Sequence, residues 1–129
     1  MAAGAPERRK LVSAFLDRVR EPGARHIAPE RLIREIGVSV ADLAHYSHVN
    51  RNTIARHPSS PKLQDRLREI VQVISSASEI AADDDEAIAW FKYQPIAAYG
   101  FKTPAELVAE GEAAAVLAYL EDCRNGVYA

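Results

Sequence analysis

The segment of sequence that decides the fold is WFKYQPIAAYGFKTPAELVAEGEAAAVLAYL, residues 90–120. It opens with an aromatic cluster, is interrupted at Pro95 and Gly100, and continues with Thr103 and, three residues later, Glu106. This spacing is typical of a capping box, in which each side chain bonds the backbone N–H of the other residue. The sequence therefore predicts a helix that starts directly after Thr103, followed by a second helix rich in Ala, Val and Leu.

Apolar residues at helical spacing predict the core around this segment. We expect six side chains to be buried there: Ile88, Trp90, Phe91, Val108, Val116 and Leu120. Upstream, an apolar stripe with alternating steps of four and three residues consists of Leu63, Leu67, Ile70, Ile74, Ala77 and Ala81. The stripe predicts one long helix over 61–82. No stretch alternates apolar and polar residues long enough for a strand, so the predicted fold class is all-α, with about seven helices.

Shorter helices are predicted in the N-terminal part, over 6–20 and 29–36. Residues 39–57 then predict a helix-turn-helix, since Ser39 and Asn50 are both good caps for a following helix. Small or aliphatic residues fall where two crossing helices need them, at Ala44, Val49 and Ile54. The turn position often taken by glycine is His48, for which a left-handed backbone costs more. By itself, this segment is equally compatible with a plain helical hairpin that binds no ligand.

Charge divides the chain into two unlike parts. Residues 1–68 hold 13 of the 16 Lys and Arg and 7 of the 18 Asp and Glu, a net charge of +6, together with all four histidines. Residues 69–129 hold the remaining 3 basic and 11 acidic residues, a net charge of −8. Such asymmetry suggests that one part faces a polyanion and the other a basic partner. We therefore predict a basic region, 1–68, and an acidic domain, 69–129, that share a core through the helix over 61–82.

The order of motifs in the last third of the chain resembles the C-terminal domain of Xre/ParS/MbcA-type antitoxins, the partners of RES-domain toxins. The resemblance rests on the aromatic pair Trp90-Phe91, then Pro95, Gly100, Thr103-Pro104, Glu106-Leu107 and Gly111-Glu112. Part of the linker departs from the family pattern, at Ala97, Ala98 and Tyr99. The segment over 39–57 resembles the Xre-type helix-turn-helix of the same antitoxins. The resemblance implies an N-terminal helix-turn-helix bundle packed on a small helical toxin-binding and dimerisation domain.

Two sets of candidate binding residues follow from this architecture. The candidates for contact with DNA lie on and beside the second helix of the helix-turn-helix: Asn50, Arg51, Asn52, Thr53, Arg56 and Lys62. Arginine and asparagine can bond guanine and adenine edges, and threonine and lysine suit phosphate. The candidates for contact with the toxin are Glu112, Glu121, Arg124, Asn125, Val127, Tyr128 and Ala129. The short tail after Gly126 could enter the toxin's NAD cleft as a plug; the alternative is a frayed terminus.

Several classes of function are not supported by any motif. The sequence has no P-loop, dinucleotide fingerprint, zincin motif or nucleophile elbow, and a hydrolytic cluster of histidines with Asp42 or Ser47 lacks suitable spacing. The single Cys123 has no partner for a disulfide or metal. The acidic run 83–86 is interpreted as a helix N-terminus capped by Asp83 or Asp84 and not as a cation site. We expect no catalytic residues, no cofactor and no metal.

The predicted function is that of an antitoxin. It would neutralise an NAD-degrading RES-domain toxin by occluding the active site, and it would bind operator DNA to autoregulate its operon. The resemblance further implies a homodimer within a larger toxin–antitoxin hetero-oligomer. The alternative is a stand-alone helix-turn-helix transcriptional regulator with a C-terminal dimerisation domain. No apolar run approaches the ~20 residues of a membrane span and no signal peptide is recognisable at the N-terminus, so we expect a cytoplasmic protein that does not interact with membranes.

Overall fold

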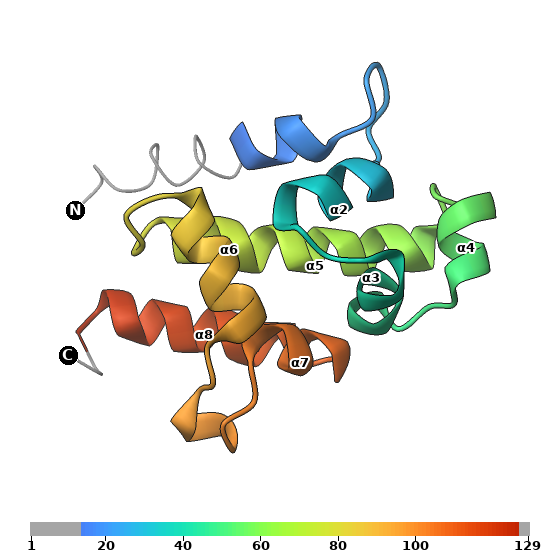
Figure 1. Cartoon of the computed structure of the whole chain (residues 1–129). Coiled ribbons are helices and arrows are strands. Elements are labelled where there is room, and N and C mark those ends of the chain that lie inside the picture. The colour runs from blue at the N-terminus through green and yellow to red at the C-terminus, as the bar shows by residue number, and fades with distance from the viewer. Residues whose placement is uncertain (1–13, 127–129) are drawn as a thin grey trace.

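The fold is all-α, as predicted. The computed structural model describes residues 14–126. Residues 14–19 are helical, and the elements that follow are α2 (Pro29–Ile36), α3 (Val40–Ser47), α4 (Arg51–Arg56), α5 (Pro61–Ser78), α6 (Asp84–Tyr93), the 3₁₀ helix η1 (Ala97–Tyr99), α7 (Pro104–Ala109) and α8 (Ala113–Arg124) (Figure 1). Within 14–126 no strand forms, and extended pairing is limited to two isolated bridges, Arg20 with Ile27 and Ile96 with Lys102.

Helix α5 runs through the middle of the molecule, with α2 on one side, α8 on the other and α6 crossing it (Figure 1). Its apolar stripe is fully buried at Leu63, Leu67, Ile70 and Ile74. The hydrophobic cluster around it includes residues of both the basic and the acidic part. Tyr46 of α3 and Phe91 of α6 also meet edge to face, with ring centroids 5.8 Å apart. The prediction of a shared core is therefore confirmed, whereas the division into two domains stays a prediction.

The long central helix is shorter than the sequence pattern predicts, because it ends at Ser78 and not at Ala82. Its last turn tightens through i→i+3 bonds, from the N–H of Glu79 to the Ser76 carbonyl (3.3 Å) and from the N–H of Ile80 to the Ala77 carbonyl (3.0 Å). Asp83 then adopts an extended backbone (φ −157°, ψ 177°) to cap α6. The signal that starts the next helix thus limits the length of this one.

Helix starts agree with the predicted caps, with one difference. Asp83 accepts the N–H of Glu86 at 2.8 Å, as an N-cap of α6. The Thr103 hydroxyl accepts the N–H of Glu106 at 3.1 Å. The reciprocal half of that predicted capping box is wrong, since the Glu106 carboxylate accepts from the Thr103 hydroxyl (3.2 Å) and, within residues 14–126, forms no bond to the Thr103 N–H.

The predicted core is also corrected at one residue. Ile88, Phe91, Val108, Val116 and Leu120 are buried. Trp90 is only half-buried and packs at the edge of the cluster. It follows Ala89 on the exposed side of α6, so its large ring covers the core without entering it.

Candidate functional site

The helix-turn-helix of α3 and α4 is held by local hydrogen bonds. Ser39 Oγ accepts the N–H of Asp42 (3.0 Å), and Asp42 Oδ2 accepts the N–H of Ser39 (3.1 Å), which together form a complete capping box. These bonds from Ser39 hold the pKa of the Asp42 carboxyl below its ordinary value. At the other end His48 takes the left-handed conformation (φ 57°), and the N–H of Val49 reaches the Ala44 carbonyl at 3.1 Å. The sequence thus tolerates a histidine where glycine would be less strained.

The predicted DNA-binding residues fall into two groups on α4 and the turn before it. Asn50 Oδ1 accepts both the N–H of Thr53 (2.9 Å) and its hydroxyl (3.2 Å), so these two residues mainly build the helix start. Arg51, Asn52 and Arg56 are exposed along α4, whereas its Ile54 is buried against the core. The second group therefore consists of the predicted DNA contacts that are exposed and take no part in the helix cap. Lys62, also exposed, lies nearby at the start of α5.

A hollow of about 600 Å³ opens beside α3 and α4, lined in part by His45, His48, Asn50, Thr53 and Lys62. Neither Asp nor Glu occurs anywhere from residue 43 to residue 64. In the described part of the chain Arg51, Arg56 and Lys62 form no salt bridge. A surface whose exposed cations form no salt bridge among the described residues has the charge that attracts phosphate groups.

The geometry also gives no support to the hydrolytic cluster that the sequence analysis rejected. The Ser47 side chain is fully buried, and its hydroxyl has no hydrogen-bond partner in the described part of the chain, so it is not accessible to a substrate. The Asp42 carboxylate accepts a hydrogen bond from the Ser39 N–H as part of the capping box. Among residues 14–126 no group of three His, Cys, Asp or Glu side chains is placed to hold a metal ion.

The predicted toxin-binding residues do not form one cluster. Glu112 precedes the first residue of α8 and lines a hollow with Tyr99 and Lys102. Glu121, Arg124 and Asn125 lie at the opposite end of this helix, whose 12 residues span about 18 Å. The remaining predicted residues, Val127, Tyr128 and Ala129, lie outside the described part of the chain.

Arg124 belongs to an intramolecular network. Its guanidinium forms ion pairs with Glu79 and with Glu121, and it donates to Ser76 Oγ at 3.4 Å. Only 18% of the Arg124 side chain is exposed. The residue therefore ties the end of α8 to the end of α5, and its first role is to position these two helices.

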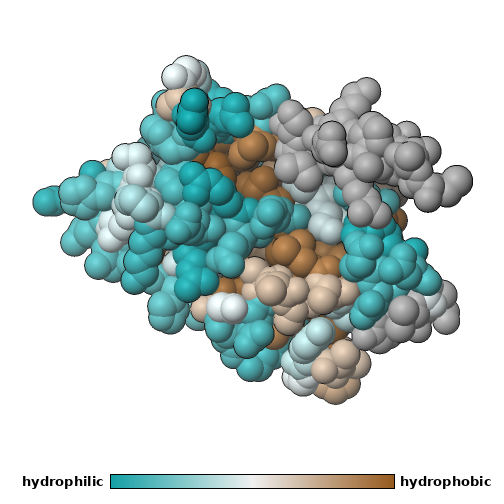
Figure 2. Space-filling model, turned by 180° about the vertical axis from the view of Figure 1, so that it is seen from behind, coloured by the Kyte–Doolittle hydropathy of each residue, from teal (hydrophilic) through white to brown (hydrophobic). Residues whose placement is uncertain are grey.

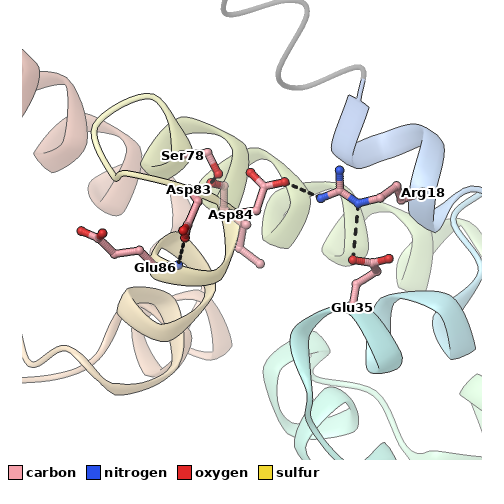
Figure 3. Close-up of polar contacts among 7 residues, drawn as sticks. Arg18, Glu35, Ser78, Asp83, Asp84 and Glu86 are labelled. Atoms are coloured by element: carbon pink, nitrogen blue, oxygen red, sulfur yellow. Dashed lines mark hydrogen bonds and ion pairs between the residues drawn. The ribbon is translucent and has the colours of Figure 1, made fainter.

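A similar tie connects the acidic run before α6 with the basic part of the chain. Figure 3 shows the Arg18 guanidinium between Asp84 and Glu35, at 2.5 Å from Asp84 Oδ2 and 3.4 Å from Glu35 Oε2. Partial burial acts to lower the pKa of Arg18, but the hydrogen bonds and charges of the two carboxylates outweigh it, so the pKa is raised. Asp84 thus serves the packing of α6 against the first helix, which agrees with a structural interpretation of the acidic run.

Sequence reasoning missed an apolar hollow between the end of α5, α6 and α8. Its volume is about 150 Å³, and it is lined by Ala77, Ile80, Ala81, Glu86, Ala87, Trp90, Tyr119, Leu120 and Cys123. Figure 2 shows some apolar surface near the centre of the rear face, with hydrophilic residues on part of its border, so apolar surface is exposed on that face as well. One signal pointed to this hollow, because Ile80 is a large apolar residue that lies off the stripe of the helix predicted over 61–82.

In the part of the chain that the structure describes, no helix is long and apolar enough to cross a membrane.

Comparisons with known proteins identify the fold. No protein-family model matches the sequence, and no curated protein matches it. The chain is similar to a chain in the crystal structure of the M. tuberculosis MbcT–MbcA toxin–antitoxin complex, with 22% identity and a TM-score of 0.59 over 93% of this chain and 96% of that one. The chain thus has the fold of a component of a toxin–antitoxin complex, which is consistent with the resemblance to MbcA-type antitoxins.

Proposed function

We propose that this protein is an antitoxin that binds and neutralises a cognate RES-domain, NAD-degrading toxin by occluding its active site. The observation that carries the proposal is the shared fold over 93% of this chain and 96% of a chain from a toxin–antitoxin complex. The order of motifs from Trp90 to Glu112 supports the antitoxin side of such a pair. As a protein inhibitor, the chain would need no catalytic residue of its own.

The acidic part is the proposed toxin-binding surface. A site that binds the pyrophosphate of a dinucleotide is expected to present arginines and other cations. The net charge of −8 over residues 69–129 complements such a site. We place the plug in the segment after Gly126, where Tyr128 would stack in the position of a base or nicotinamide.

Operator binding is the second proposed activity. The exposed face of α4 carries Arg51, Asn52 and Arg56, and it has no acidic residue. One helix of six residues contacts few base pairs, so useful affinity requires two copies on two half-sites. We therefore propose a homodimer, assembled with toxin into a larger hetero-oligomer, that represses its own operon.

The test is co-expression with the RES-domain toxin, followed by measurement of complex formation and of cellular NAD. The full chain should bind the toxin and preserve NAD. Deletion of residues 125–129 should leave much of the binding intact but restore NAD loss. Full protection by the truncated chain would exclude the plug, while an absence of binding by the full chain would exclude the antitoxin function.

A stand-alone transcriptional regulator is the second candidate, favoured by the exposed cations of α4. In that case the C-terminal part would only dimerise or sense a signal. A RES-domain reading frame that is adjacent and co-transcribed would favour the antitoxin. Its absence, together with operator binding by the chain alone, would favour the regulator.

A further inference from the structure

The apolar hollow between α5, α6 and α8 has no role in the function described so far. We propose that it is an anchor site for the partner toxin and that it takes an apolar side chain from a toxin segment flanked by Lys or Arg. The inference rests on the proposed function, because it names where that toxin is held. It adds a contact that the chain end and the carboxylates of α8 do not provide.

The hollow has the size and lining for one large apolar side chain. Its volume of about 150 Å³ is comparable with that of apolar protein cavities that hold benzene. Small residues, Ala77, Ala81 and Ala87, leave the space open. Trp90 and Tyr119 border it, and both are half-buried at the edge of the core. Aromatic residues around an apolar depression are typical of the centre of a protein interface.

Ile80 presents an exposed apolar side chain at this hollow. It lies off the apolar stripe of α5, in the turn that follows the last helical residue, Ser78. Its exposed fraction is 47%, which makes it one of four exposed large hydrophobic residues among those described. A partner that covers Ile80 together with Trp90 would remove apolar surface from water on both sides of the contact.

The charge around the hollow selects a basic partner. Glu86 lines it, Asp85 shares the first turn of α6 with Glu86, and Asp83 is the N-cap of that helix. Asp122 precedes the lining residue Cys123. None of these four carboxylates forms a salt bridge with another residue in 14–126.

Nearby cations do not cancel this charge. Arg18 is paired with Asp84 and Glu35, and Arg124 is paired with Glu79 and Glu121. The lining thus carries one carboxylate, from Glu86, and three more lie within two residues of a lining residue in the sequence. Lys or Arg beside the inserted side chain would complement this negative charge.

Two substitutions with matched controls test the anchor by titration with the purified RES-domain toxin. Ile80→Lys removes the apolar contact, and its control is Val40→Lys, since Val40 has a similar exposed fraction (42%) on α3. Asp85→Lys reverses a charge in the first turn of α6, and its control is Glu30→Lys, an exposed acidic residue in the first turn of α2. Each pair makes the same kind of change at and away from the hollow. Circular dichroism checks that all four variants are folded.

We expect Ile80→Lys to weaken toxin binding by at least tenfold. Asp85→Lys should weaken it about three- to tenfold at low salt, with a flatter dependence on ionic strength, because one long-range attraction is lost. Both controls should bind within twofold of the unsubstituted chain. Trp90 is the single tryptophan, so 5-fluorotryptophan labelling gives one ¹⁹F resonance from this hollow, which should shift when toxin binds.

The outcomes separate the inference from the function on which it rests. If the full chain binds toxin, yet Ile80→Lys and Asp85→Lys bind equally well and the ¹⁹F resonance does not move, the anchor is wrong and the antitoxin function stands. If the full chain binds no toxin, the proposed function is wrong and the anchor with it.

Discussion

The helix-turn-helix and the acidic part of the chain differ in whether their cationic side chains form salt bridges. Around α4 the cations Arg51, Arg56 and Lys62 form no salt bridge within residues 14–126. In the acidic part, the described cations are used internally: Lys102 pairs with Glu110, Arg124 pairs with Glu79 and Glu121, and Lys92 reaches the Gly37 carbonyl at 3.4 Å.

The difference indicates which charges are available to partners. Among the described residues, the cations around α4 form no salt bridge, whereas the acidic part pairs its cations and still has carboxylates without a salt-bridge partner. Each surface is therefore complementary to a partner of the opposite charge. The helices under both surfaces nevertheless contribute to one hydrophobic cluster. We therefore expect both surfaces to be lost together when that cluster is disrupted. Separable binding and a common core are two claims that substitutions can test independently.

The largest effect is expected from Phe91→Ala, which removes a ring that is fully buried in α6 and touches Tyr46 of α3. Loss of a buried aromatic side chain costs about 3–5 kcal/mol. Chemical denaturation followed by circular dichroism should show one transition at lower denaturant, and both operator and toxin binding should fall. Two transitions, with only one of them shifted, would mean that the halves fold independently.

The next largest effect is expected from replacing both Arg51 and Arg56 by Ala. Each arginine that pairs with a base edge contributes about 1–3 kcal/mol, so operator affinity should drop by at least about tenfold at moderate salt. Toxin neutralisation should be unchanged. Gel shift and NAD assays on the same preparation test this, with Arg25→Ala as a control for an exposed arginine outside the helix-turn-helix. Equal loss of both activities would refute two separable surfaces.

A smaller and opposite effect is expected where each region holds a non-glycine residue in the left-handed conformation. These residues are His48 (φ 57°) in the helix-turn-helix and Phe101 (φ 63°) in the loop before α7. Replacement of either by Gly should raise the free energy of unfolding by about 0.5–1 kcal/mol, because the left-handed strain of roughly 1–2 kcal/mol is partly offset by the entropy of glycine in the unfolded chain. Thermal melting measures the change. A lower melting temperature for Phe101→Gly would show that its 71% exposed ring makes contacts that stabilise the loop.

The smallest effect concerns pH and the capping box of α3. The folded protein lowers the pKa of Asp42 below its ordinary 3.8, chiefly through hydrogen bonds from Ser39. A lowered folded pKa gives stability that is present above pH 3.8 and is lost as pH falls through the folded value. Asp42→Asn should therefore be less stable than the unsubstituted chain at pH 7, and the difference should shrink toward pH 3. A difference that is constant from pH 7 to pH 3 would mean that the carboxylate charge has no part in the cap.

Local structure was largely predictable from the sequence. The starts of α2, α3, α4, α6 and α7 follow from capping residues and prolines, because the bonds that begin a helix join residues three positions apart. The buried stripe of α5 follows from its helical period. Exposure of Arg51, Asn52 and Arg56 also follows, since these residues surround the one buried aliphatic of α4.

What only the tertiary structure decided is how residues distant in sequence share or divide a surface. Periodicity alone could not show that α5 ends at Ser78 or that Arg124 forms an ion pair with Glu79. Nor could it show that Ile80, Trp90 and Tyr119 border one hollow. These contacts join three helices separated by turns, so they depend on how the helices pack and not on the order of neighbouring residues. Sequence therefore determined the helices and the sign of each surface, whereas packing determined which charges remain unpaired and where an apolar partner can be held.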